Sequence, residues 1–97
     1  MWILETAADS EAGRLVFRVS PGDIKTIGRT PRADFMLDVP LVSRLHCRLT
    51  AGPTGLDLVD LDSTNGTFVN DRRITKAALA PGDRITIGRV SLMVSKK

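Results

Sequence analysis

Apolar and polar residues alternate with a period of two along several stretches of the chain. In the clearest of them Leu15, Phe17 and Val19 fall on one face, and Arg14 and Arg18 fall on the other. This is the period of a β-strand with one buried face, because an amphipathic helix repeats its apolar positions every 3.6 residues. The pattern predicts short strands at eight places: 2–6, 14–19, 23–27, 46–50, 56–61, 67–69, 84–87 and 90–94.

Turn-forming residues separate these runs. Glycine and proline recur between them, most densely at 52–55 and 81–83. The Asn65-Gly66 pair favours positive φ, which is typical of a tight hairpin turn. Two further stretches, 7–12 and 75–80, could be helical but are too short to be stable alone, so we expect a loop or a single turn in each. Many short strands with regular turns indicate an all-β sandwich or barrel.

The length of 97 residues predicts one domain with one core. At this size folding hides roughly 60–70% of the surface of the unfolded chain. With 42% hydrophobic residues, such a core needs no metal or disulfide to hold it. The single cysteine, Cys47, lies in an alternating run and is interpreted as a small buried hydrophobe rather than a reactive thiol. An unpaired cysteine also favours a reducing, cytoplasmic setting.

No apolar stretch approaches the roughly 20 residues that a membrane helix needs, and the first residues lack the features of a signal peptide. We therefore expect a soluble, cytoplasmic protein. Its net charge is +3, and ten of its fourteen basic residues are arginine. Arginine suits forked recognition of phosphate or carboxylate, so this excess favours an anionic partner without identifying it.

The sequence offers little support for enzymatic chemistry. Its one histidine, His46, lies three residues after Ser43, but no nucleophile elbow of the G-x-S-x-G type surrounds the serine. One histidine next to one cysteine makes no metal site, since neighbours on a strand point to opposite faces. Neither glycine pattern of the nucleotide-binding loops occurs. We predict no catalysis, no metal and no cofactor.

Several loop residues between the predicted strands have anion-binding character. Arg29 follows one strand, Ser43 and Arg44 precede another, and Thr64 precedes a third. Loops at one end of a β-sandwich come together. Two guanidinium groups and two hydroxyls meeting there would make charge-assisted hydrogen bonds to one phosphate. Taken singly, each of these residues is equally well an ordinary surface charge or turn residue.

Taken together, these segments resemble the forkhead-associated (FHA) domain family. The matching segments are Gly28-Arg29, Ser43-x-x-His46, the stretch DLDSTNGTFVN at 60–70 and the stretch LAPGDRITIG at 79–88. They stand in the family's order and spacing. The resemblance implies that residues 1–97 form a single FHA domain, a β-sandwich of about eleven short strands with phosphothreonine-binding loops at one end.

The resemblance also implies a role for each matching residue. The guanidinium of Arg29 and the hydroxyl of Ser43 would grip the phosphate, with Arg44 as a second positive charge. Thr64 would add a hydroxyl or backbone contact. The amide of Asn65 would hold the main chain of the peptide. The histidine, a suspected catalyst on the residue pattern alone, becomes a structural residue. The residues expected to support the site are Gly28, His46, Gly66, Thr67 and Asn70.

The expected partner is a phosphothreonine-containing protein bound in trans, either a Ser/Thr kinase or a kinase substrate, and the domain is expected to be a monomer. A small pocket for the threonine γ-methyl would reject phosphoserine by about 10- to 200-fold. Arg32 or the Arg72-Arg73 pair is a candidate for reading an acidic residue three positions after the phosphothreonine. The sequence departs from the family at Asn70-Asp71, where a glycine commonly follows the asparagine, so this turn is expected to differ in shape.

Two other binding functions stay open. One is an FHA domain that contacts its partner without phosphate, as part of a larger assembly, although every expected phosphate ligand is present. The other is nucleic-acid binding through the arginines. This would need aromatic platforms for the bases, and Trp2, Phe17 and Phe68 are predicted to face the core. We therefore expect no nucleic-acid partner.

Overall fold

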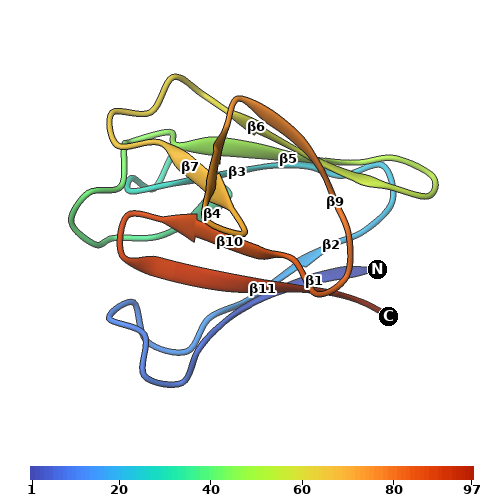
Figure 1. Ribbon diagram of the computed structural model, residues 1–97, viewed down its shortest axis with the longest axis horizontal. Helices are drawn as coiled ribbons and strands as arrows, with labels where there is room; N and C mark the ends of the chain where they lie inside the picture. The colour runs from blue at the N-terminus through green and yellow to red at the C-terminus, as the bar shows by residue number, and fades with distance from the viewer.

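The computed structural model describes residues 1–97 and contains eleven β-strands and no helix. The strands form two sheets that pack face to face (Figure 1). The predicted fold class, an all-β sandwich of about eleven short strands, is therefore confirmed.

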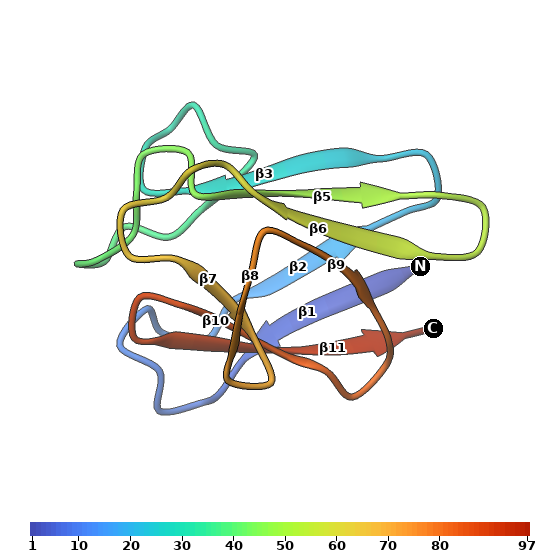
Figure 2. The ribbon, with the colours of Figure 1, turned by 45° about the horizontal axis from the view of Figure 1, so that its top comes forward.

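The first sheet has six strands and the second has five. The order in the first sheet is β2 (Val16–Val19), β1 (Trp2–Thr6), β11 (Val90–Lys96), β10 (Arg84–Ile87), β7 (Thr67–Val69) and β8 (Arg72–Ile74). The order in the second is β4 (Phe35–Met36), β3 (Ile24–Gly28), β5 (Cys47–Ala51), β6 (Leu56–Asp60) and β9 (Lys76–Leu79). Only β3 and β4 pair in parallel. Figure 2 shows the two layers, with β3, β5 and β6 above β1 and β11.

The core lies between the sheets and receives alternate side chains from each strand. Ile85, Ile87 and Leu92 from one sheet and Leu49 and Leu58 from the other are fully buried. Burying each such side chain stabilises the fold by about 1.5–3 kcal/mol, compared with leaving the side chain exposed to water. The alternation that predicts the strands is therefore the one that fills the core.

One predicted loop is a strand instead. The sequence predicts a loop or a single turn at 75–80, but β9 occupies most of this stretch and pairs with β6. The prediction is wrong because it considers only the local helical preference of these residues. In the folded protein, pairing with β6 and the burial of Leu79 opposite Leu56 outweigh that preference. The strands β4 and β8 have two and three residues, too few to show a period in the sequence.

The prediction that Phe68 faces the core is also wrong. Phe68 pairs with Thr86 and Arg73, on the outer face of the first sheet, and is only partly buried. Its neighbour Thr67 takes the inward position and is fully buried. A polar residue can lie there because its hydroxyl donates to the carboxylate of Asp60 at 2.6 Å.

The turn between β7 and β8 consists of Asn70 and Asp71. Asn70 and Asp71 both lie in the left-handed region, with φ values of 50° and 68°, as in a two-residue type I′ hairpin. The Asn70 side chain anchors this turn by accepting the N–H of Arg84 and donating to Asp83. Gly66 has the expected positive φ. No hairpin forms there, however, because β6 and β7 belong to different sheets.

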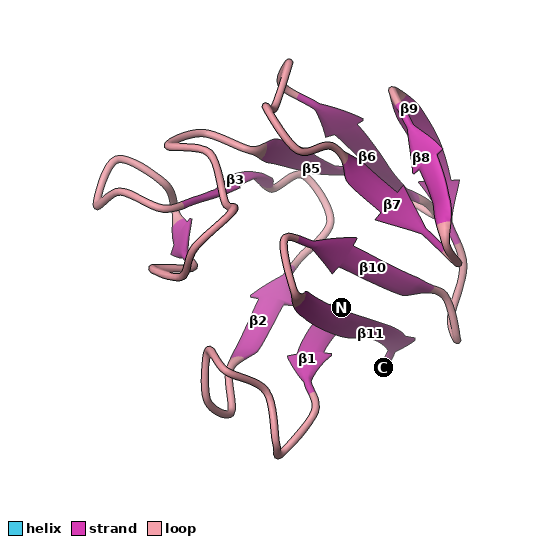
Figure 3. Cartoon of the chain, turned by 60° about the vertical axis from the view of Figure 1, so that its left-hand side comes forward, coloured by secondary structure: helices cyan, strands magenta, loops and turns pink.

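Three loops gather at one end of the sandwich: β3–β4 (29–34), β4–β5 (37–46) and β6–β7 (61–66). Figure 3 turns this end toward the viewer. The β10–β11 turn lies there too, with Gly88 close to Pro40 and Leu41. The two chain termini lie together at the opposite end (Figure 1), where the Met1 amino group donates to the Lys97 carbonyl at 3.0 Å.

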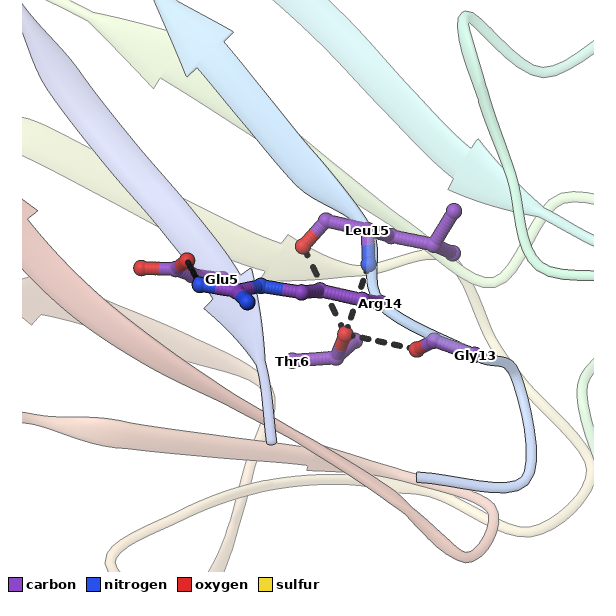
Figure 4. Close-up of polar contacts among 5 residues, drawn as sticks. All are labelled: Glu5, Thr6, Gly13, Arg14 and Leu15. Atoms are coloured by element: carbon purple, nitrogen blue, oxygen red, sulfur yellow. Dashed lines mark hydrogen bonds and ion pairs between the residues drawn. The ribbon is translucent and has the colours of Figure 1, made fainter. Parts of the chain in front are cut away.

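The β1–β2 connection is closed at its base by a buried threonine (Figure 4). The hydroxyl of Thr6 donates to the carbonyl of Gly13 at 2.8 Å and accepts the N–H of Leu15 at 2.7 Å. Glu5 and Arg14 form an exposed ion pair beside it, at 3.6 Å. The polar groups at the buried base of this loop are thereby satisfied.

Candidate functional site

The β4–β5 loop is hydrogen-bonded to both of its neighbouring loops. On one side, the N–H of Arg29 donates to the carbonyl oxygens of Ser43 at 3.0 Å and Arg44 at 3.1 Å. On the other side, the N–H of Thr64 donates to the Ser43 hydroxyl oxygen at 3.1 Å. Asn65 follows directly in the chain. The five residues predicted to contact a ligand therefore come from three loops and lie side by side.

Arg29 begins the β3–β4 loop, and Gly28 permits its position. A Cβ atom added to Gly28 would lie 2.0 Å from the carbonyl oxygen of Arg44. Only a glycine therefore lets β3 approach the β4–β5 loop closely enough for the Arg29 hydrogen bonds. The Arg29 side chain is half exposed, and its Nε lies 3.6 Å from a carboxylate oxygen of Asp38. So long and exposed an ion pair is weak, and a phosphate could replace it at little cost.

We expect Gly28→Ala to lower the free energy of unfolding by about 1–3 kcal/mol, which is the usual cost of forcing a methyl group into filled space. Urea unfolding at neutral pH measures this change. Gly55→Ala is the matched control, because nothing lies within 4 Å of the added Cβ there and the φ of Gly55 is not positive. Equal stability of the two variants would contradict the close approach of β3 to the β4–β5 loop.

Both hydroxyl groups of the site keep a proton that no atom of the protein accepts. The Ser43 oxygen accepts the N–H of Thr64, so its own proton is free to be donated to a ligand. Thr64 is exposed, and its hydroxyl makes no hydrogen bond within the protein. Two hydroxyl donors therefore lie on loops that are hydrogen-bonded to one another and that also carry Arg44 and contact the backbone of Arg29.

The Asn65 side chain is anchored by one of its two N–H groups. Its Nδ2 donates to the carbonyl of Leu41 at 3.1 Å, which leaves one N–H and the amide oxygen for other contacts. A donor and an acceptor on one amide match the main chain of an extended peptide. Leu41 itself has a φ of 73°, a conformation that costs a non-glycine residue about 1–2 kcal/mol.

His46 is fully buried beneath these loops and joins them through four hydrogen bonds. Its backbone N–H donates to the carbonyl oxygen of Ile27 at 2.8 Å, and its own carbonyl oxygen accepts the N–H of Leu61 at 3.0 Å. In the ring, Nδ1 accepts the N–H of Ser43 at 3.0 Å, and Nε2 donates to the carbonyl of Gly66 at 2.8 Å. Because a carbonyl only accepts and Nδ1 is itself an acceptor, this geometry requires a neutral ring with its proton on Nε2. Neither nitrogen is free to act on the Ser43 hydroxyl.

The sequence reasoning missed Asp60 as a residue that supports the site. One carboxylate oxygen accepts the hydroxyls of Ser63 at 2.5 Å and Thr67 at 2.6 Å, and the other accepts the N–H of Ser63 at 3.1 Å. The Ser63 oxygen in turn accepts the N–H of Gly66 at 3.0 Å. The carboxylate thus holds both ends of the β6–β7 loop. A sequence signal exists in the spacing of Asp60 and Ser63, since an Asp side chain often bonds a backbone N–H a few residues on.

The stability of the fold should depend on pH through Asp60. Burial raises the pKa of this carboxyl, but the hydrogen bonds from Ser63 and Thr67 outweigh burial and hold the pKa below its usual 3.8. Because the folded-state pKa is the lower one, the carboxylate stabilises the fold above about pH 4, and this contribution is lost as the pH falls through the folded-state pKa. We expect the free energy of unfolding to fall between about pH 5 and pH 2, and to fall less in Asp60→Asn.

Urea unfolding across that pH range tests this dependence. Asp9→Asn is the matched control, because Asp9 is an exposed loop carboxylate with no hydrogen bond or ion pair in the structure. We expect this variant to follow the wild type. If Asp60→Asn also followed the wild type, the proposed role of the carboxylate would be contradicted.

Two other kinds of reactive group are relevant here, a metal-binding cluster and the thiol of Cys47. No group of three or more His, Cys, Asp or Glu side chains is placed to hold a metal ion. Burial raises the pKa of the Cys47 thiol to about 12, and a thiol in that state is a poor nucleophile. The structure contains no helix that is long and apolar enough to cross a membrane. What the loop end offers is a set of hydrogen-bond donors and positive charges.

The chain is similar to known proteins in sequence and in fold. The chain is 41% identical over 81 residues to the ABC transporter ATP-binding/permease protein Rv1747 of Mycobacterium tuberculosis, an alignment that covers 84% of the chain but 9% of that protein. It superposes with a TM-score of 0.86 on the FhaA FHA domain complexed with the intracellular domain of Rv3910, at 33% identity over 97% of this chain and 99% of that one.

A second solved structure, from an analysis of phosphothreonine-dependent FHA domain interactions, gives a TM-score of 0.88 at 32% identity and covers 99% of this chain and 96% of that one. The sequence model of the FHA domain matches residues 25–88, about two thirds of the chain. This chain belongs to the FHA domain family.

Proposed function

We propose that this FHA domain binds a phosphothreonine-containing segment of a partner protein, in trans, through the three loops at one end of the sandwich. The observation that carries the proposal is that the loops bearing the two arginines, the two hydroxyl groups and the amide are hydrogen-bonded to one another at one end of the sandwich. Such a set matches the acceptor oxygens of one phosphate and the main chain beside it.

The proposed roles follow from charge and hydrogen bonding. A phosphothreonine carries about −1.5 to −2 charges at neutral pH, so Arg29 and Arg44 together would balance it. Their guanidinium groups stay charged at every relevant pH. Ser43 and Thr64 would donate their hydroxyls to the phosphate oxygens, and Asn65 would hold the peptide main chain. None of these groups needs to change its protonation state to bind.

Two solved relatives support this mode of binding. One comes from work on phosphothreonine-dependent FHA domain interactions, and the other is an FHA domain in complex with the intracellular domain of another protein. We also infer that residues 1–97 act as one binding module and not as an enzyme. The partner would be a Ser/Thr kinase or a kinase substrate, and the domain would bind it as a monomer.

Three matched peptides test the proposal: one sequence with threonine, phosphothreonine or phosphoserine at its centre, titrated against the protein at physiological salt. We expect binding of the phosphothreonine peptide, and binding of the phosphoserine peptide weaker by about 10- to 200-fold, the usual discrimination of one methyl group. Equal binding of the unmodified peptide would contradict the proposal and favour a contact that is independent of phosphate.

A further inference from the structure

The two sheets end in edge strands on both sides of the sandwich. On one side lie β2 and β4, where the ring of Phe17 stacks on the ring of Phe35 with centroids 4.4 Å apart, so side chains cover this side. On the other side lie β8 and β9, each paired with a single neighbour. The chain passes from β8 to β9 through Thr75 alone (Figure 2). The longer of these two edge strands is β9, with four residues.

Half of the backbone groups of β9 point away from its neighbour β6. The N–H of Asp60 donates to the carbonyl oxygen of Thr75 at 2.9 Å. In an antiparallel pair the bonded positions alternate, so the register places the next bonds to β6 at Ala77 and Leu79. The N–H and carbonyl groups of Lys76 and Ala78 therefore face the free edge of the sheet.

The side chains of β9 leave these backbone groups accessible. Ala78 is exposed, and its methyl group is too short to shield the N–H and carbonyl beside it. Edge strands are commonly protected by a proline, a bulge or a charged side chain. Within β9 the lysine at position 76 is the one such device. This edge is therefore closed to a positively charged strand but open to one that complements the lysine.

Positive charge accumulates along the two edge strands without being neutralised. Arg72, Arg73 and Lys76 are all exposed, and none of them takes part in an ion pair. The acidic residue that precedes them, Asp71, is bound instead to Arg84 at 2.7 Å. Five consecutive residues, 72–76, thus carry three positive charges and no negative one. Such a stretch attracts an anionic partner.

The charge also decides between two occupants of the edge. A second copy of this chain would bring its own Lys76 to the shared edge, and like charges on neighbouring strands are destabilising. An acidic segment gains attraction at the same place. The acidic residues of β6, Asp57 and Asp60, lie one strand in from the edge, and the Asp60 carboxylate already accepts the hydroxyls of Ser63 and Thr67. The edge therefore fits an acidic strand better than a second copy.

We propose that the free edge of β9 binds an extended acidic segment of a partner protein as a sixth strand of the second sheet. The backbone groups of Lys76 and Ala78 would form the hydrogen bonds, and the Lys76 ammonium would pair with a carboxylate. Alternate side chains of an added strand face opposite sides of the sheet. The segment would thus alternate acidic residues, beside Lys76, with apolar residues on the side of the half-buried Ala77. This contact needs neither a phosphate nor the three loops of the proposed site.

Amide hydrogen exchange followed by NMR tests the added strand. The probe is an eight-residue peptide in which glutamate alternates with valine, added to the protein at up to millimolar concentration and neutral pH. We expect exchange at the N–H groups of Lys76 and Ala78 to slow by about tenfold or more, and exchange at Ala77 and Leu79, which already bond to β6, to stay unchanged. The same peptide with lysine in place of glutamate should have no effect. No slowing with the acidic peptide, or equal slowing with the basic one, would overturn the proposal.

Two variants test the backbone bonds and the charge separately. Ala78→Pro removes an outward N–H that has no partner in the sheet, which an edge strand tolerates, and should abolish binding of the acidic peptide. Lys76→Glu should weaken it by about five- to tenfold. Arg18→Glu is the matched control for the charge change, because Arg18 is exposed on β2 without an ion pair, and it should bind as the wild type does.

The edge and the proposed phosphothreonine site fail independently. Arg29→Ala should bind the acidic peptide as the wild type does, and Lys76→Glu should keep its affinity for a phosphothreonine peptide. Binding of the acidic peptide that is lost in Arg29→Ala but kept in Lys76→Glu would place it at the loops and overturn the edge site. Failure of a phosphothreonine peptide to bind the wild type would overturn the proposed function and leave the edge site standing.

Discussion

Replacing Arg29 by alanine is expected to weaken the binding of a phosphothreonine peptide by roughly 10- to 100-fold, which corresponds to losing a charged hydrogen bond of about 1.5–3 kcal/mol. The fold should not change, because the side chain is half exposed and its ion pair with Asp38 is long, at 3.6 Å. The backbone N–H of Arg29, which joins two loops, remains in the variant. The measurements are the dissociation constant and the urea midpoint of the same preparation.

Two further variants show whether the loss comes from the geometry of Arg29 or from charge alone. Arg29→Lys keeps the charge but not the forked pair of donors, so we expect an affinity between those of the wild type and the alanine variant. Arg48→Ala removes an exposed arginine from the outer face of β5, with no ion pair, and should bind as the wild type does. A loss in Arg48→Ala as large as in Arg29→Ala would mean unspecific attraction and would contradict the proposed site.

Replacing His46 by alanine is expected to lower the free energy of unfolding by about 3–5 kcal/mol. The substitution empties a fully buried position. It also leaves the N–H of Ser43 and the carbonyl of Gly66 without their partners. The total free energy of unfolding of a domain of this size is about 5–15 kcal/mol, so this loss is a large share of the stability. Denaturant unfolding at neutral pH measures it.

A core variant distinguishes loss of the loop anchor from loss of packing. Leu49→Ala also empties a fully buried position and should cost about 2–5 kcal/mol, but Leu49 lies within β5, paired with Lys25 of β3 and Leu58 of β6, and makes none of the hydrogen bonds that join the loops. At a temperature where both variants are folded, we expect His46→Ala to bind the phosphothreonine peptide more weakly than Leu49→Ala. Equal affinity of the two variants, or a stability of His46→Ala within about 1 kcal/mol of the wild type, would contradict the anchoring role.

The loops of the site are held in place before any ligand binds. Ser43 bonds through its backbone and its hydroxyl to both neighbouring loops, and His46 and Asp60 fix the same loops from below. Ordering flexible loops on binding costs affinity, so loops that are already ordered allow a small contact surface to bind usefully. The variants that should weaken binding most are therefore Arg29→Ala, which removes a proposed ligand contact, and His46→Ala, which removes an anchor.

The strands show how far the sequence pattern reaches. Where a strand has one buried face and four or more residues, as at 84–87 and 90–94, the alternation predicts it correctly. The pattern fails at 75–80, where three alanines carry no strong signal and pairing with β6 decides the conformation. It also fails at Phe68, because the inward position beside it belongs to a threonine that is buried only through its bond to Asp60.

The candidate site divides in a similar way. The sequence identified the chemical groups of the site, because arginines and hydroxyl residues in the loops that flank predicted strands can be recognised without a structure. It did not identify Asp60 as a residue that supports the site, because the spacing of Asp60 and Ser63 does not show that Thr67 bonds to the same carboxylate.

The sequence by itself determined the fold class, the family and the chemical kind of the site, because strand alternation and the ordered loop motifs are local and can be read along the chain. Only the tertiary structure decided which residues meet. Two of the bonds that assemble the site, Ser43 to Thr64 and His46 to Gly66, join positions 20 or more residues apart. Such contacts depend on how two sheets pack and where their loops end, and no local pattern contains that information.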